Sequence, residues 1–247
     1  MKNFIKKKLK SVLSFIEINF KLNVGSKSPI DIYFDKVSQD CYEFFKEDIN
    51  KSSCFAKDDD IRQYSILKAF RNKTNNDNIF LEFGVYKGDS IKLFSKFLFK
   101  HDLKIYGFDS FQGLEEDWIA KDYNPTGTFS LEDANLKVPK NVEIIKGKVQ
   151  DTLDKFLKKN SEKKVIFVHM DMDTYTPTNY TLDKIKPFLQ KGSIILFDEL
   201  YNFPNWKNHE YKALTEAFNE NEYKFVAFAN RQATNLYSFS LNASVNA

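Results

Sequence analysis

The sequence is poor in the residues that mark several common classes of protein. Only two of its 247 residues are cysteines, Cys41 and Cys54, and they stand in no metal-binding spacing. With few cysteines and no recognisable signal peptide, we expect a protein of the reducing cytoplasm. The apolar residues come in short runs, none close to the eighteen or so that a membrane-spanning helix needs. We therefore expect the protein to be soluble.

Net positive charge is confined to one segment of the chain. The formal net charge is +3, yet residues 1–25 hold six lysines against a single acid, Glu17. No basic stripe with interleaved aromatic residues runs through the rest of the chain, which argues against nucleic-acid binding. The positive charge is thus a feature of the N-terminal segment and not of the body of the protein.

Two interpretations of this segment follow from its pattern. Apolar residues recur at helical spacing over residues 3–15, which predicts an amphipathic helix with a lysine-rich face, and strict alternation over 16–24 favours an extended segment. Such a helix can attach to an anionic membrane surface. It can equally pack on the domain or on a second subunit in a homo-oligomer. The apolar pattern continues well beyond the lysines, so packing is the interpretation that we favour.

The rest of the chain shows helical patterns followed by a regular alternation of strands and helices. Helices are predicted over 36–49 and 58–71, and we divide the chain into this N-terminal part, 1–74, and a domain over 75–247. The alternation predicts a doubly wound, mostly parallel sheet of seven strands with helices on both faces. Two closely spaced strand patterns near residues 223–229 and 235–241 predict a C-terminal antiparallel hairpin. The predicted strands are 79–83, 104–109, 142–146, 164–170 and 193–198, and the predicted helices are 89–100, 151–159, 178–190 and 207–220.

The first predicted strand turns through two glycines into a helix. Gly84 and Gly88 can adopt backbone angles closed to other residues, and they allow a ligand to approach the main chain and the helix amides. Glu82 would repel a phosphate at this turn but suits a ligand with an ammonium or sulfonium group. One βα unit later, Asp109 ends the next strand, where an acid suits a ribose diol.

Carboxylates also follow two later strands of the predicted sheet. Asp171 and Asp173 come directly after the strand 164–170, and Asp198 and Glu199 follow the strand 193–198. The carboxyl ends of neighbouring parallel strands face the same crevice. So many like charges are unfavourable together unless a cation compensates them, and oxygen ligands suit Mg²⁺ or another divalent ion. The alternative is that some of these acids cap the following helices, with Asp173 the best candidate.

In this order, the motifs resemble those of class I S-adenosylmethionine-dependent methyltransferases, and most closely the macrocin O-methyltransferase family. The resemblance covers about residues 75–240. It rests on Leu81-Glu82-Phe83-Gly84-Val85-Tyr86-Lys87-Gly88, Gly107-Phe108-Asp109-Ser110-Phe111-Gln112-Gly113-Leu114, Ile145-Lys146-Gly147, Asp151-Thr152-Leu153, His169-Met170-Asp171-Met172-Asp173-Thr174-Tyr175 and Gly192-Ser193-Ile194-Ile195-Leu196-Phe197-Asp198-Glu199.

The resemblance implies a role for each of these positions. Asp109 would bind the ribose, Ser110 and Phe111 would flank the adenine, and the residues around the cofactor's methionine moiety would be Glu82, Gly84, Tyr86, Gly88 and Ser90. Asp171, Asp198 and Glu199 would bind the divalent ion. Related metal-dependent enzymes usually place a lysine three residues after the first acid, where this chain has Thr174. The identity of the general base therefore stays open. Either the acceptor oxygen, bound to the metal at Asp171, needs little help from a base, or His209 serves as the base.

The expected function is a magnesium-dependent O-methyltransferase that acts on a hydroxyl of a small polar acceptor, such as a sugar or a glycosylated metabolite. One alternative is a nicotinamide-dependent oxidoreductase, against which Glu82 and the lack of a compact Gly-x-Gly-x-x-Gly run argue. Another is a non-catalytic scaffold that binds the cofactor, against which the acids argue. The acceptor-specific loops cannot be derived from the sequence.

Overall fold

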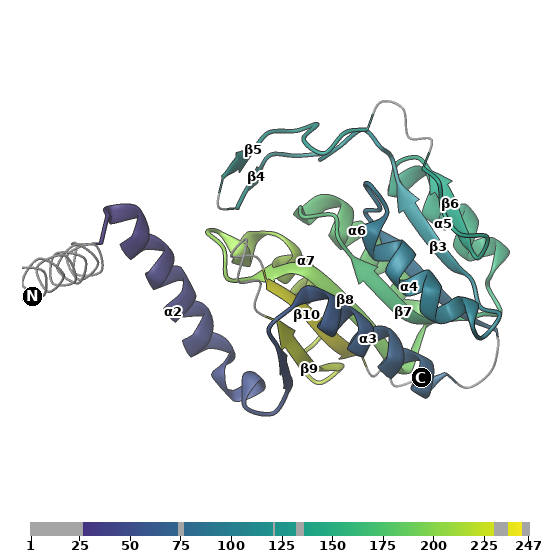
Figure 1. Cartoon of the computed structure of the whole chain (residues 1–247), viewed down its shortest axis with the longest axis horizontal. Coiled ribbons are helices and arrows are strands. Elements are labelled where there is room, and N and C mark those ends of the chain that lie inside the picture. The colour runs from purple at the N-terminus through teal and green to yellow at the C-terminus, as the bar shows by residue number, and fades with distance from the viewer. Residues whose placement is uncertain (1–26, 74–76, 121, 132–135, 230–236, 244–247) are drawn as a thin grey trace, which may run out of the picture. The chain divides into compact units, whose positions relative to one another are not determined.

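The computed structural model describes most of the chain, as residues 27–73, 77–120, 122–131, 136–229 and 237–243 (Figure 1). It divides into two compact units, residues 1–37 and residues 38–247. The predicted helix over 3–15 and the extended segment over 16–24 lie outside the described residues. Both interpretations of the N-terminal segment therefore stay predictions.

The first described helix, α2 (Pro29–Ile49), begins seven residues before the predicted start at 36. A reciprocal pair of hydrogen bonds explains the early start. The amide of Asp31 donates to Ser28 Oγ at 3.1 Å, and the amide of Ser28 donates to Asp31 Oδ2 at 3.1 Å. This pair forms a capping box, and Pro29 follows directly as the first helical residue, a position that proline suits.

The centre of the unit over 38–247 is an eight-stranded sheet in the order β1-β9-β10-β8-β7-β2-β3-β6. Within this sheet, strand β10 pairs antiparallel with both of its neighbours, and the other pairings are parallel. This confirms the predicted doubly wound, mostly parallel sheet. The strands are β1 (Ser53–Phe55), β2 (Asn78–Phe83), β3 (Ile105–Asp109), β6 (Val142–Lys146), β7 (Lys164–Met170), β8 (Leu189–Tyr201), β9 (Tyr223–Ala229) and β10 (Tyr237–Ala243).

Strand β1 is the eighth strand, which the sequence pattern did not predict. It is three residues long and pairs parallel with β9, so it forms the edge beyond the C-terminal hairpin of β9 and β10. The predicted hairpin is confirmed, although β10 lies inside the sheet between β9 and β8. A strand of three residues is too short to show the alternation from which strands are recognised in a sequence.

Helices cover both faces of the sheet (Figure 1). α3 (Asp58–Asn72) and α4 (Asp89–Phe99) contact each other on one face, where α3 also packs on β7 and β8. α5 (Val149–Lys159), α6 (Tyr175–Ile185) and α7 (Glu210–Ala217) contact one another in sequence on the other. Helix α6 is shorter than predicted, because Pro187 lies in a 3-10 turn over 186–188 that precedes β8. α7 is shorter too, and a 3-10 turn over 206–208 precedes it.

Aromatic side chains fill much of the space between the layers. Phe80, Phe94 and Phe167 are fully buried, and the ring of Phe94 meets that of Phe167 edge-on at 5.0 Å. Burial of such side chains supplies the main favourable term for the fold. The core thus uses the high phenylalanine content, 25 residues, to hold α4 against the centre of the sheet.

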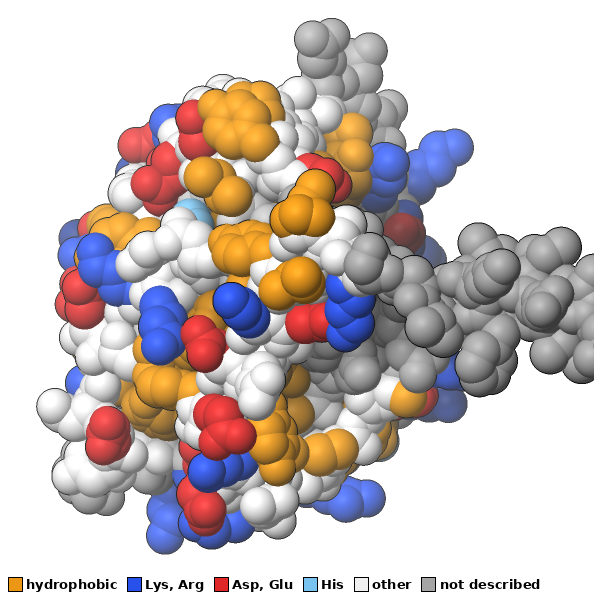
Figure 2. Space-filling model, turned by 90° about the vertical axis from the view of Figure 1, so that its left-hand side faces the viewer, with side chains coloured by type: hydrophobic (Ala, Val, Ile, Leu, Met, Phe, Trp, Pro, Cys, Tyr) orange, Lys and Arg blue, Asp and Glu red, His pale blue; other side chains and the backbone are white. Residues whose placement is uncertain are grey.

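The surface shows no concentration of one charge on the face drawn in Figure 2. Lysine and arginine side chains alternate there with acidic ones, and apolar side chains lie among them. Large apolar residues that are exposed include Tyr42, Phe44, Ile119 and Tyr123. Among the described residues, no helix combines the length and the apolar character that crossing a membrane requires.

Candidate active site

The turn between β2 and α4 has the conformation that the glycine spacing predicted. Gly84 and Gly88 have φ angles of 84° and 77°, in the left-handed region that favours glycine. Gly88 occupies the N-cap position of α4, so the first amides of this helix face the turn. The predicted backbone conformation of both glycines is confirmed, and their role in binding a cofactor stays a prediction.

Asp109 organises this turn from the end of the neighbouring strand β3. Its Oδ2 accepts hydrogen bonds from the amides of Val85 at 2.8 Å and Tyr86 at 2.7 Å, and its Oδ1 accepts one from the amide of Phe111 at 2.6 Å. Three backbone donors are thus satisfied by one carboxylate. Oδ1 accepts only one of these bonds and keeps a second lone pair, so Asp109 can still accept from a ligand.

Gly84 also joins the turn to the acidic end of β7. The amide of Asp171 donates to the carbonyl of Phe83 at 2.8 Å, and a Cβ atom added at Gly84 would overlap the carbonyl oxygen of Asp171. Only glycine permits this close approach of the two chain segments. The two groups of candidate site residues are therefore held together through backbone contact at Gly84.

A cavity of about 450 Å³ opens over the turn and the strand ends. Its volume lies in the range of small-molecule sites. The cavity reaches from the β2 turn to the acids that follow β7 and β8, and it brings together most of the predicted residues. Those that line it are Gly84, Tyr86, Gly88, Ser90, Asp109, Ser110, Asp171, Asp198 and Glu199.

Three predicted residues are not among those that line the cavity. Glu82 is fully buried behind the turn, Phe111 is buried with its amide bound to Asp109, and His209 is buried at the start of α7. The predicted direct contacts of Glu82 and Phe111 with a cofactor thus lack a place in this cavity. Period-two alternation tells which face of a strand a side chain occupies, but not whether the ligand reaches that side chain.

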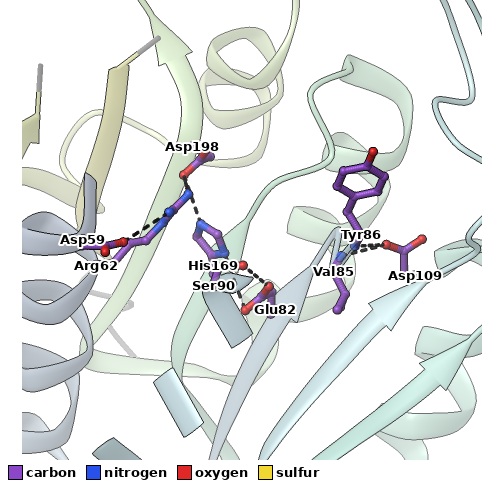
Figure 3. A network of polar contacts seen from close by, with 9 residues as sticks. All are labelled: Asp59, Arg62, Glu82, Val85, Tyr86, Ser90, Asp109, His169 and Asp198. Carbon is purple, nitrogen blue, oxygen red and sulfur yellow. Dashed lines mark hydrogen bonds and ion pairs between the residues drawn. The ribbon is translucent and has the colours of Figure 1, made fainter. Parts of the chain in front are cut away.

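Glu82 instead belongs to a buried chain of polar contacts (Figure 3). The hydroxyl of Ser90 donates to Glu82 Oε1 at 2.6 Å, and Glu82 Oε2 lies 3.7 Å from Nδ1 of His169 on the next strand. His169 Nε2 lies 3.3 Å from Asp198 Oδ1, which also accepts from Arg62 Nη2 at 2.8 Å. The strand register explains the contact between Glu82 and His169, since these two residues pair directly between β2 and β7. The cofactor turn and the acids are therefore linked through one histidine.

The charge state of His169 follows from its two acidic neighbours. Burial alone would lower the pKa of His169, but the hydrogen bond with Asp198 and the nearby carboxylate of Glu82 raise it to about 9. His169 is then a buried cation at neutral pH. Arg62 is likewise held in its charged form, because the carboxylates of Asp198 and Asp171 outweigh the effect of its burial and raise its pKa.

The acidic residues at the ends of β7 and β8 outnumber these two cations. Ligand atoms of Asp171, Asp173 and Glu199 lie within 4.8 Å of one another, and so do those of His169, Asp171 and Asp198. Burial, followed by the charge of Asp198, raises the pKa values of Asp171 and Glu199 well above those of ordinary carboxyl groups. Both groups share Asp171. The cluster can hold a hard cation, which would compensate the repulsion.

Two residues of this cluster were not found from the sequence. Arg62 comes from α3, and only the packing of α3 on β8 brings its guanidinium to Asp198. Glu210, at the first position of α7, is fully buried and accepts from the amide of Glu199 at 3.2 Å. Burial and the charges of Asp173, Asp171 and Asp198 raise the pKa of Glu210. No local pattern distinguishes either residue from an ordinary helix-surface charge.

The amide of Thr176 in the first turn of α6 donates to Glu116 at 2.7 Å, and Asp173, the best candidate for a helix cap, lies within the acid cluster. The ring of His209 packs beside that of Phe203, with the ring centres 6.1 Å apart, and its Nε2 lies 3.4 Å from the side-chain Nδ2 of Asn205. Burial lowers the pKa of His209, which keeps it neutral.

The comparisons with known proteins agree with this geometry. A family model described as a methyltransferase domain matches residues 81–200, which contain the β2 turn, Asp109 and the acids of β7 and β8. A comparison with curated protein sequences gave no match. The chain thus shares the sequence features of a methyltransferase domain over the part that forms the cavity.

Solved structures show the same fold. A crystal structure of CalS11, a calicheamicin methyltransferase, is similar with a TM-score of 0.60 and 21% identity, over 90% of this chain and 89% of that one. The apo structure of CalS11, described as a TDP-rhamnose 3'-O-methyltransferase, is similar with a TM-score of 0.54 and 21% identity, over 90% of each chain. The O-methyltransferase NovP has a TM-score of 0.52 and 18% identity, over 75% of this chain and 78% of its own.

The fold and the glycine turn with its acid at the next strand define a Rossmann-like domain built to bind a cofactor at the strand ends. The family match over residues 81–200 identifies a methyltransferase domain there, so the protein is an enzyme of the methyltransferase kind. Its fold is similar to that of solved S-adenosylmethionine-dependent methyltransferases of class I.

Proposed function

We propose that the protein transfers the methyl group of S-adenosylmethionine to a hydroxyl of a small polar acceptor, with a sugar or a glycosylated metabolite as the leading acceptor. The observation that carries the proposal is the acid cluster of Asp171, Asp173 and Glu199 at the end of the same cavity that holds the cofactor turn. The sugar acceptor draws support from CalS11, whose structure is described as that of a TDP-rhamnose 3'-O-methyltransferase.

The cofactor would lie over the β2 turn. Gly84, Tyr86, Gly88 and Ser90 would surround its methionine moiety, and Ser110 would lie beside the adenine. Asp109 would accept from a ribose hydroxyl with the lone pair of Oδ1 that its three backbone donors leave. Glu82 would act from behind the turn, because its hydrogen bond from Ser90 fixes the Ser90 hydroxyl at the cavity wall.

A divalent cation fits the acid cluster. The donors are carboxylate oxygens, which Mg²⁺ prefers, and burial followed by the charge of the neighbouring Asp198 raises the pKa values of Asp171 and Glu199. Asp171, Asp198 and Glu199 would hold the ion, with Asp173 close enough to Asp171 and Glu199 to take part. When bound, the ion would bind the acceptor oxygen and lower the pKa of its hydroxyl.

The chemistry is a displacement at carbon. The acceptor oxygen forms a bond to the methyl carbon, the bond from this carbon to sulfur breaks with its electron pair, and S-adenosylhomocysteine leaves. The hydroxyl proton passes to a base. The carboxylates of Asp171 and Asp173 line the cavity and can accept it, whereas His209 is separated from the cavity and is the weaker candidate. The cavity holds the two reactants in line, which lowers the entropic part of the barrier.

The remaining expectations stand as proposals. A cytoplasmic location, a homo-oligomer and a peripheral membrane contact through residues 1–25 rest on the sequence. The family match over residues 81–200 gives no support to the nicotinamide-dependent oxidoreductase or to the non-catalytic scaffold.

Transfer of a labelled methyl group tests the proposal. We would incubate the protein with methyl-labelled S-adenosylmethionine and Mg²⁺ and offer TDP-rhamnose, other nucleoside diphosphate sugars, simple glycosides and catechol in parallel. Label in a sugar, lost in Asp171→Asn and retained in the exposed-site control Asp154→Asn, is the expected result. Transfer to catechol alone, or to no hydroxyl compound, would overturn it.

A further inference from the structure

The segment between β3 and β6 forms part of the cavity wall. Its described residues from 110 to 131, with residue 121 left out, are named here the cover loop, and they include the two short strands β4 (Trp118–Ile119) and β5 (Tyr123–Asn124). In Figure 1 this loop reaches from β3 across to the side of α6 and α7. Gly113, Leu114, Glu115, Trp118 and Phe129 line the cavity from this loop.

Several hydrogen bonds hold the cover loop in place. The amide of Leu114 donates to the carbonyl of Thr128 at 2.9 Å, which closes the base of the loop. Gln150 of α5 donates to Glu115 Oε2 at 3.0 Å, and the amide of Thr176 in α6 donates to Glu116 Oε1 at 2.7 Å. The loop is thus tied to two helices on the same face of the sheet, so its side chains have defined positions.

Within the described part of the chain, Trp118 of this loop has a buried hydrogen-bond donor without an acceptor. Its side chain lines the cavity, is only 3% exposed and packs edge-on against Phe203 with the ring centres 5.9 Å apart. Its indole Nε1 is buried and finds no hydrogen-bond acceptor among the described residues. A buried donor without an acceptor costs free energy, so buried indole groups usually have a partner. A ligand in the cavity can supply that partner.

The contact with Phe203 indicates at which end of the cavity Trp118 lies. Phe203 follows β8 two residues after Tyr201, and so lies close in sequence to the acids Asp198 and Glu199. The cofactor turn, by contrast, meets the other part of the loop, where the ring of Phe129 packs against Tyr86 at 5.7 Å. Trp118 therefore lies on the acid side of the cavity, where the methyl acceptor would bind.

We propose that Trp118 is a specificity-determining residue that binds the methyl acceptor. Its indole N–H donates a hydrogen bond to a hydroxyl or ring oxygen of the acceptor, and its ring covers one apolar face of a sugar. Leu114 adds apolar surface on the same loop. The group thus selects acceptors that combine C–H faces with oxygen lone pairs, which is the chemistry of a sugar. The inference rests on the proposed function and adds the residue that recognises its substrate class.

Paired substitutions at the two tryptophans test this. The chain has only two, and Trp206 is buried among Phe44, Phe45 and Tyr211 and does not line the cavity. Trp118→Phe keeps an aromatic ring against Phe203 but removes the N–H donor, and Trp206→Phe is the matched control. For methyl transfer to TDP-rhamnose we expect Trp118→Phe to raise the acceptor KM about three- to tenfold. S-adenosylmethionine affinity by calorimetry should stay within about twofold in both variants.

A binding measurement accompanies the kinetics. In Trp206→Phe, Trp118 is the single tryptophan, so its fluorescence should change when TDP-rhamnose is added to the complex with S-adenosylhomocysteine and should not change with catechol. Equal acceptor KM values in Trp118→Phe and Trp206→Phe, while the wild type methylates TDP-rhamnose or another sugar of the panel, would overturn the assignment of Trp118 and leave the proposed function intact. A wild type that methylates no sugar and shows no fluorescence change would overturn both.

Discussion

At one end of the cavity a single carboxylate, Asp109, is held by three backbone amides, whereas at the other end the carboxylates of Asp171, Asp173 and Glu199 lie within 4.8 Å of one another. The cofactor end is therefore electrostatically balanced by the chain itself. The acid end gathers several carboxyl groups, and burial followed by the charge of Asp198 raises the pKa values of Asp171 and Glu199. We infer that the two ends of the cavity are stabilised differently: the cofactor end by backbone hydrogen bonds to Asp109, and the acid end by a bound cation.

The contact between the two ends gives the largest expected effect. Gly84→Ala places a Cβ on the carbonyl of Asp171 in a left-handed conformation, and it should lower the free energy of unfolding by about 4 kcal/mol or more. Gly127→Ala is the matched control, because Gly127 has a similar φ of 86° but no atom within 4 Å of the added Cβ. It should cost only about 1 kcal/mol. Equal melting temperatures for the two variants would show that Gly84 is not a point of close contact.

The histidine that links the two ends should contribute nearly as much. A pKa raised from the ordinary 6.5 to about 9 makes protonated His169 a stabilising group, worth about 3 kcal/mol. Since the folded-state pKa is the higher one, this stability is fully present below about pH 6.5 and is lost as the pH rises through about 9. His169→Gln should therefore destabilise the protein strongly at pH 6.5 in urea unfolding, and much less at pH 9.5.

The exposed His101 provides the control for this variant. His101 stacks on Phe70 and touches no carboxylate of the cluster, so His101→Gln should give a small loss of stability at both pH values. A deficit of His169→Gln that does not change between pH 6.5 and 9.5 would show that packing, and not charge, is what His169 provides.

Asp109 tests the cofactor end. Asp109→Asn keeps an oxygen for the backbone amides but loses the charge, and it should weaken S-adenosylmethionine binding about tenfold in calorimetry, or about 1.4 kcal/mol. Asp109→Ala also frees the amides of Val85, Tyr86 and Phe111 and should lower the melting temperature as well. Unchanged affinity in folded Asp109→Asn would remove the ribose assignment.

Substitution of Glu210 has the smallest expected effect, and it should stabilise the protein where the other substitutions destabilise it or weaken binding. A carboxyl with a raised pKa binds its proton more tightly in the folded protein, so stability falls as the pH rises above the ordinary value near 4.5. Glu210→Gln keeps an acceptor for the amide of Glu199 but carries no charge. Metal-free Glu210→Gln should be about 1 kcal/mol more stable than wild type at pH 8 and equal to it at pH 5. The exposed variant Glu220→Gln should match wild type at both, and destabilisation by Glu210→Gln at pH 8 would refute the repulsion.

The sequence was sufficient for the elements that repeat a local pattern. The alternation of strands and helices predicted the parallel sheet, and the glycine spacing predicted the left-handed turn at Gly84 and Gly88, because both follow from local periodicity and backbone sterics. The acids at the ends of β7 and β8 were predicted to meet because parallel strands bring their carboxyl ends to one edge.

The parts that the sequence did not predict depend on tertiary packing. Arg62 reaches Asp198 only because α3 lies over β8, and Glu210 reaches the acids only because α7 starts beside them. Glu82 lies close in sequence to the turn but is turned away from the cavity toward His169. Trp118 stands in a loop with no periodic pattern, and its position depends on anchors in α5 and α6.

The central claim, that the acid end requires a cation, is tested most directly by adding Mg²⁺ to protein stripped with EDTA at pH 8. We expect saturable binding of Mg²⁺ in calorimetry and a higher melting temperature of the protein. Methyl transfer should be lost in EDTA and restored by Mg²⁺, while S-adenosylmethionine affinity changes little. Asp171→Asn should abolish the Mg²⁺ effects. Full methyl transfer after exhaustive chelation, with neither heat nor a change in melting temperature on addition of Mg²⁺, would contradict the claim.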